Sequence, residues 1–238
     1  MQRALASILS LLCLGALPGC GVTTTQTKSS RIKLDRERAL VTRSAVVVRS
    51  ANPDIAVERV DAVRSKRGGA IAVKLRNVSD RPLAELPISV GVSEGGRRRL
   101  LNSKSGLGYF DTHVPALGPK QSQVWVLPLR GALPGGAPFA VVGRATTPAE
   151  PSVAELPTLS ARSIASGAAL TAQVHNHSDV PQRSIQVYAW SSAGGRIVAA
   201  GRGSVASLAA GGSAALRVRV FGAPRGAPRI SAPPTVYE

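Results

Sequence analysis

Apolar and polar residues alternate with a period of two along several short stretches of the chain. In the first part of the chain the alternating apolar positions are Ile71, Val73, Leu75, Leu86, Ile88, Val90, Val92, Trp125, Leu127 and Leu129. In the second part they are Leu170, Ala172, Val174, Ile185, Val187, Ala189, Leu216, Val218 and Val220. Such alternation is typical of half-buried strands, and no stretch beyond the N-terminal region has a helical period. The pattern therefore predicts an all-β protein.

The two sets of strands belong to an internal duplication. Leu75–Pro82 aligns with Val174–Pro181 at a constant offset of 99 residues, and both contain the motif Asn-x-Ser-Asp-x-Pro. The pair Gly95-Gly96 falls on Gly194-Gly195 at the same offset. After an insertion in the first copy, the register resumes at residues 117–119, which match residues 208–210. Two copies of this size predict two tandem domains, repeat 1 over 52–145 and repeat 2 over 146–238.

The predicted strands are separated by residues that favour turns. In the repeated motif, Asn tolerates the left-handed conformation, Asp bonds local backbone and Pro excludes helix, so the motif is expected to form a loop. The two Gly-Gly pairs fit tight hairpin turns. We therefore predict two small antiparallel β-sandwiches of immunoglobulin-like size. Ala45 to Arg49 are a candidate for an additional strand before the first repeat.

The order of strand, Asn-containing turn, strand and Leu-x-x-Gly-type turn resembles bacterial surface modules of the CARDB and fibronectin type III kind. The resemblance spans residues 52–238 and rests on the turns of both repeats. It implies a tandem of immunoglobulin-like sandwiches and carries no catalytic residues with it. Modules of this kind in envelope proteins mostly adhere, space or present, and the fold does not decide among these roles.

The first residues have the composition of a targeting segment. Arg3 is followed by the apolar stretch Ala4–Leu17, which is too short to span a bilayer as a helix and suits a secretory signal. The stretch ends in Leu17-Pro18-Gly19-Cys20, which resembles the lipobox of bacterial lipoproteins, although Pro18 stands where the family usually has Ala or Ser. The alternative is an ordinary secretory signal whose cleavage site contains a cysteine.

The resemblance implies that residues 1–19 are a signal peptide and that Cys20 is lipidated and becomes the mature N-terminus. Cys13, the other cysteine of the chain, would leave with the signal, so no disulfide is expected. Residues 20–51 then form a linker that begins with the polar tether Gly21–Ser30. We accordingly expect a protein exported to the cell envelope and held on the membrane by its lipid anchor.

The chain is strongly basic, with 30 Lys and Arg against 13 Asp and Glu and a net charge of +17. The charge is distributed through the linker and both repeats, which favours long-range attraction to an anionic surface over one dedicated pocket. Anionic envelope polymers such as wall polymers or anionic glycans are therefore candidate partners, and polyanion binding is the alternative function. A solvated arginine-rich surface explains the charge equally well. Nucleic acid is not expected, because the chain has an export signal and only 3% aromatic residues.

Residue patterns for catalysis or metal binding are sparse. His175 and His177 alternate on a predicted strand, but a metal site needs three or four ligands and no others are apparent nearby. Asp111 and His113 could contribute to a Ser-His-Asp arrangement, yet no Gly-x-Ser-x-Gly elbow is present. We therefore expect a protein that is not an enzyme, with no metal and no cofactor.

Two groups of aromatic residues are the candidate interaction sites. Tyr109, Phe110 and His113 lie in Leu101–Val114, the insertion unique to the first repeat, which either carries a binding loop or packs against the sandwiches. Tyr188 and Trp190 face outward if Ile185, Val187 and Ala189 face inward. A partner surface, a domain–domain contact or a bulged strand would each explain this arrangement. The sequence thus favours a non-enzymatic envelope lipoprotein that serves as a structural or interaction module, with another envelope protein as a possible kind of partner.

Overall fold

The computed structural model describes residues 45–145, 156–165 and 170–235. The predicted signal peptide, Cys20 and most of the linker lie outside these residues, and the predicted boundary between the repeats adjoins the undescribed stretch 146–155. We call residues 45–145 the first half and residues 156–235 the second half. Within the described ranges, no helical segment has the length and apolar character needed to cross a bilayer.

The first half forms two antiparallel sheets. Its elements are β1 (Ile55–Ser65), β2 (Gly68–Asn77), β3 (Leu86–Glu94), β4 (Arg97–Leu100), the short 3-10 helix η1 (Tyr109–Asp111), β5 (His113–Val114), β6 (Ser122–Leu129) and β7 (Ala137–Val142). One sheet has the order β1-β2-β6. The other has the order β4-β3-β5, with β7 also paired to β3. All these pairings are antiparallel.

The second half forms two further antiparallel sheets. Its strands are β8 (Leu159–Ala165), β9 (Leu170–Asn176), β10 (Gln182–Ala193), β11 (Arg196–Leu208), β12 (Ser213–Val218), β13 (Val220–Gly222) and β14 (Arg229–Ser231). The sheet orders are β12-β9-β8 and β13-β11-β10-β14. The prediction of an all-β antiparallel sandwich fold is confirmed.

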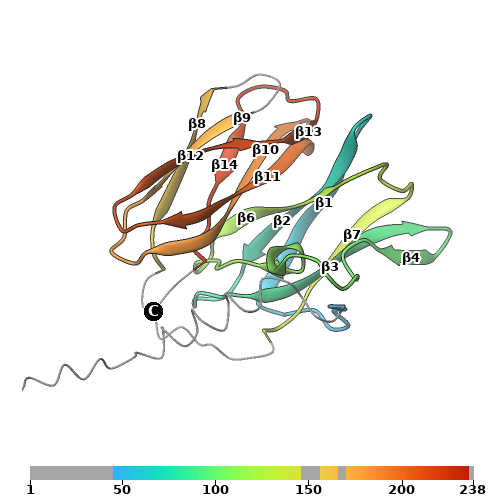
Figure 1. The fold of residues 1–238 in the computed structure, drawn as a ribbon. Coiled ribbons are helices and arrows are strands. Elements are labelled where there is room, and N and C mark those ends of the chain that lie inside the picture. Colours follow the sequence, from blue (N-terminus) through green and yellow to red (C-terminus); the bar gives the residue numbers. More distant parts are fainter. Residues whose placement is uncertain (1–44, 146–155, 166–169, 236–238) are drawn as a thin grey trace, which may run out of the picture.

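The four sheets lie in successive layers, and the two halves share a hydrophobic core. Sheet β1-β2-β6 of the first half lies between its own partner sheet and the β11-β10 sheet of the second half (Figure 1). One apolar cluster accordingly contains most of the first half's core together with Tyr188, Ile197, Ala200 and Phe221 from the second half. A separate cluster fills the second half's own sandwich.

The middle strand of the β1-β2-β6 sheet is buried on both faces. Ile71 and Val73 face the first half's own core, as the alternation predicts, but Ala70 and Ala72 on the other face are also fully buried. The prediction of a half-buried strand was therefore wrong for this part of β2, because the second half packs on its other face. Beyond Val73 the strand returns to alternation, and the charged residues of β2 become exposed.

The two Gly-Gly pairs form tight hairpins, as predicted. Gly95 and Gly96 have φ values of 56° and 77°, and Gly194 and Gly195 have values of 55° and 74°. Positive φ at both central residues is the signature of a type I′ turn, which suits the twist of paired strands. The flanking residues pair directly, Glu94 with Arg97 and Ala193 with Arg196.

The repeated Asn acts through its buried side chain. Neither Asn77 nor Asn176 has a positive φ, so neither adopts the left-handed conformation that Asn tolerates. Each is fully buried, and its Oδ1 accepts from the backbone N–H and the hydroxyl of the serine two residues later. Each Nδ2 donates to carbonyls of its own loop and of the later turn, among them Gly118 in the first half and Ala209 in the second. The duplication thus preserves a buried polar link between two loops.

Ala45–Arg49 form no strand. The segment lies against the edge of the first half, where the backbone N–H of Val48 donates to the hydroxyl of Ser89 at 2.8 Å. Gly143 approaches the Val48 side chain closely, so that a Cβ at this glycine would stand 2.9 Å from Val48 Cγ1. The segment is held by a side-chain hydrogen bond and by packing in place of strand pairing.

Candidate functional site

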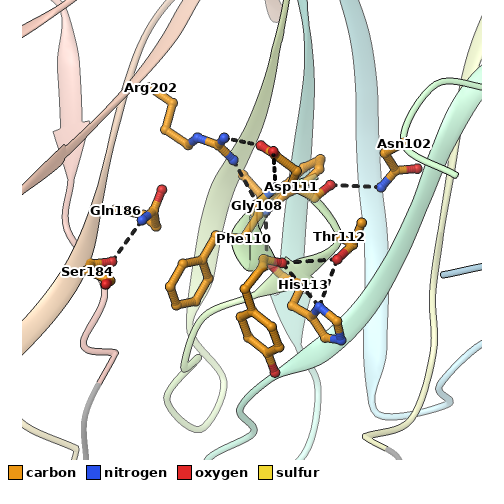
Figure 2. Close-up of polar contacts among 11 residues, drawn as sticks. Asn102, Gly108, Phe110, Asp111, Thr112, His113, Ser184, Gln186 and Arg202 are labelled. Atoms are coloured by element: carbon orange, nitrogen blue, oxygen red, sulfur yellow. Dashed lines mark hydrogen bonds and ion pairs between the residues drawn. The ribbon is translucent and has the colours of Figure 1, made fainter. Parts of the chain in front are cut away.

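A buried asparagine holds the insertion of the first half, Leu101–Val114, in place. Asn102 is fully buried. Its Oδ1 accepts the Val90 backbone N–H at 2.9 Å, and its Nδ2 donates to the carbonyls of Ile88 at 2.7 Å and Asp111 at 2.9 Å. These bonds tie η1 to strand β3, because one side chain satisfies backbone groups of both. Figure 2 shows the bond between Asn102 and Asp111. The insertion is therefore a fixed part of the first half.

Arg202 of β11 reaches across from the second half and binds the insertion. Its guanidinium pairs with the Asp111 carboxylate and donates to the Phe110 carbonyl at 2.9 Å (Figure 2). The other carboxylate oxygen of Asp111 accepts the Gly108 backbone N–H at 2.9 Å. The side chains of Arg202 and Asp111 are only 14% and 19% exposed, so the pair is largely shielded from water. The insertion is thus joined to the second half by the ion pair between Asp111 and Arg202.

The aromatic candidates of the insertion pack on one another. The rings of Tyr109 and His113 are stacked, with centroids 4.0 Å apart and an interplanar angle of 2°, and Phe110 meets Tyr109 edge-on at 5.3 Å. His113 Nδ1 lies 3.1 Å from the Tyr109 carbonyl and 3.0 Å from the Thr112 hydroxyl. Burial lowers the pKa of His113 below its ordinary value, and the hydrogen bond with the Tyr109 carbonyl acts in the opposite direction. All three aromatic side chains are half-buried.

Tyr188 and Trp190 point away from the core of the second half and into the contact with the first half. Tyr188 is fully buried and belongs to the shared core, so it is not accessible to an external partner. Of the readings left open, the domain–domain contact is the one observed. Trp190 packs beside this core but is only half-buried. It therefore remains the accessible member of this pair.

A second polar contact joins the halves through Asp61 of β1. Its side chain is only 4% exposed, its Oδ2 accepts the Ile197 backbone N–H at 3.0 Å, and its Oδ1 lies 3.5 Å from Arg196 Nε. Sequence reasoning missed both Asp61 and Arg202. Nothing in the sequence indicates that a single charged residue of a basic chain is buried. The burial of Asp61 and Arg202 follows only from the packing of the two halves against each other.

The histidine and aspartate candidates are engaged in local contacts. His175 Nδ1 and His177 Nε2 bind the hydroxyls of Ser213 and Ser160, each at 2.7 Å. In the part of the chain that the structure describes, no three His, Cys, Asp or Glu side chains gather as a metal site would require. Asp111 is engaged by Arg202, while His113 Nδ1 bonds within its own loop.

Among the residues that the structure describes, two grooves open at the contact between the halves and another lies within the second half. The first, about 660 Å³, is lined by β1, β2 and β6 on one side and by Trp190, Ile197 and Arg229 on the other. A second, about 540 Å³, is lined by several prolines and includes Gln123 and Ser231. A third, about 390 Å³, lies within the second half and also includes Trp190. Trp190 thus lines two of these grooves.

Comparison with known proteins gives no family for this chain. No protein-family model matches, and no curated protein matches. Among solved structures, a crystal structure of red sea bream transglutaminase matches with 10% sequence identity and a TM-score of 0.19. The match covers 88% of this chain and 32% of that chain, so this chain spans about a third of the length of that protein. A likeness this low carries no argument about fold or function.

Proposed function

We propose that this chain is a non-enzymatic envelope lipoprotein, anchored in the membrane through Cys20, that serves as a structural or interaction module. Two immunoglobulin-like sandwiches would be held off the membrane by the polar linker of residues 20–51. The partner would be another envelope protein or an anionic envelope polymer.

The observation that carries this proposal is the shared core of the two halves. Tyr188 is fully buried among first-half residues, and Arg202 and Asp61 add polar contacts across the same boundary. A large apolar contact between domains restricts their relative motion, whereas small polar contacts permit it. A rigid unit on the predicted polar tether would be suited to presenting a surface at a fixed geometry.

The side chains of the insertion also support a structural role. The Asp111 carboxylate is engaged by Arg202 and by the Gly108 N–H, and the His113 ring is stacked on Tyr109. General acid–base catalysis requires a group within hydrogen-bond reach of a substrate proton. The Asp111 carboxylate and the His113 ring instead interact with other groups of the protein.

The anchor is tested by labelling cells with radioactive palmitate in a bacterial host and separating detergent from aqueous phases. The wild-type chain is expected to carry label and enter the detergent phase, and Cys20→Ser is expected to lose both properties. Cys13→Ser is the matched control, because it removes the other cysteine within the predicted signal and should label like the wild type. Label retained by Cys20→Ser, or lost equally in both variants, would contradict the proposal.

A further inference from the structure

The groove of about 660 Å³ between the halves has a cationic wall on the side of the first half. Arg59 of β1 and Lys74 of β2 are direct cross-strand neighbours on one face of the sheet. Like charges placed opposite each other destabilise a sheet. Glu58 offsets part of this charge through an ion pair with Lys74 at 2.9 Å. The sheet therefore keeps a net positive wall at a cost in stability.

The opposite wall combines an aromatic ring with a third cation. Trp190 of β10 and Arg229 of β14 are also direct cross-strand neighbours, and both line the groove. In the described part of the chain, the guanidinium groups of Arg59 and Arg229 have no ion-pair or hydrogen-bond partner. The two walls thus present two unpaired guanidiniums and one half-buried indole to the same space.

The unpaired polar groups that the two walls present are donors. A guanidinium offers several N–H donors and no acceptor. Gln123 of β6 also borders the groove, but it pairs with Leu75, so its side chain lies on the other face of the sheet from Arg59 and Lys74. A ligand that matches Arg59 and Arg229 must be rich in acceptors and negatively charged.

We propose that this groove binds an acidic saccharide, whose carboxylates are held by Arg59 and Arg229 and whose sugar ring lies against Trp190. Arginine holds carboxylates through paired N–H···O bonds, and an indole offers a flat apolar surface for the C–H face of a ring. The volume of about 660 Å³ lies within the range of small-molecule sites.

An acidic peptide suits the groove less well. An extended peptide is recognised chiefly through backbone hydrogen bonds to a sheet edge. The groove instead offers side chains that stand on the faces of two sheets, and the backbone groups between these strands are already paired. This inference does not depend on the lipid anchor and goes beyond the proposed module role by naming a ligand class and a site.

The test is calorimetric titration of the purified full chain, in detergent, with tetragalacturonate, neutral maltotetraose and hexaglutamate. Tetragalacturonate is expected to bind, more weakly as salt increases, and maltotetraose is not. Arg59→Gln and Arg229→Gln should each weaken binding by about tenfold, as the loss of one charge-assisted contact implies. Trp190→Ala should weaken it at least as much, and its melting curve shows whether the fold is retained.

Arg97→Gln is the matched control, because it removes one exposed arginine from the distant β4 hairpin. It should change the affinity by less than twofold. Equal losses for Arg97→Gln and Arg59→Gln would show diffuse attraction and overturn the proposal. So would the absence of tetragalacturonate binding, equal binding of maltotetraose, or tighter binding of hexaglutamate with the same dependence on Arg59 and Arg229, which would reassign the groove to a peptide.

Discussion

Tyr188 offers the sharpest test of the contact between the two halves. Its side chain is fully buried, and it belongs to the cluster that forms the core of the first half although it lies on β10 of the second. Truncating a buried aromatic residue to alanine costs about 3–5 kcal/mol, because apolar burial is lost and a cavity remains. Tyr188→Ala is therefore expected to lower the free energy of unfolding of the whole chain by about that amount.

Tyr188→Phe is the matched control. The phenolic oxygen is buried without a hydrogen-bond partner in the described residues, and burial raises the pKa of this hydroxyl well above its ordinary value. Removing an unsatisfied hydroxyl and keeping the ring should leave stability unchanged or raise it by up to about 1 kcal/mol. The two variants therefore separate the contribution of the aromatic ring to stability from that of the hydroxyl group.

The assay is urea unfolding followed by two probes, one in each half. All variants carry Trp190→Phe, so that the fluorescence of Trp125 reports on the first half alone. A fluorophore attached at Ser207→Cys, in a chain without other cysteines, reports on the second half. In the wild type both probes should follow one transition, and Tyr188→Ala should shift both midpoints to lower urea. The reasoning is refuted if the second half alone shifts and Trp125 keeps its midpoint, or if Tyr188→Phe costs as much as Tyr188→Ala.

Two further predictions concern the insertion. Removing either partner of the largely buried Arg202–Asp111 pair should lower the free energy of unfolding by about 2–3 kcal/mol. A double-mutant cycle with Arg202→Met and Asp111→Asn should give a coupling energy of about 1–3 kcal/mol. Losses that simply add would show that the ion pair does not join the halves. Because burial lowers the pKa of His113, the unfolded chain binds the proton more readily, so stability should be present above pH ~6.5 and fall below it, by at most about 1.4 kcal/mol per pH unit. Unfolding at pH 7, 6 and 5 should show a flatter profile for His113→Asn, and an unchanged profile would count against a buried neutral imidazole.

The strand pattern could be predicted from the sequence because each side chain of a strand faces one side or the other. Ile71, Val73 and Leu75 mark one face of β2, and the Gly-Gly pairs mark the turns that close two of the hairpins. The pattern does not say what covers the opposite face. Ala70 and Ala72 are as compatible with solvent as with a close sheet contact, and only the second half's position shows that they are buried.

The candidate site was predictable in the same partial way. The insertion stood out because the second repeat lacks it, and Tyr188 and Trp190 stood out because they break the apolar alternation of β10. The residues that join the halves, Arg202 and Asp61, could not be singled out. Their burial depends on contacts between segments far apart in the chain, which no local pattern records.

The central claim is that the two sandwiches form one rigid unit with a shared core, and calorimetric unfolding of the full chain tests it most directly. A single heat-absorption peak is expected, with a calorimetric enthalpy equal to the van't Hoff enthalpy, because each half exposes the surface that it buries in the shared core when the other unfolds. Two resolved peaks, or a calorimetric enthalpy about twice the van't Hoff value, would show that the halves unfold independently and would contradict the account.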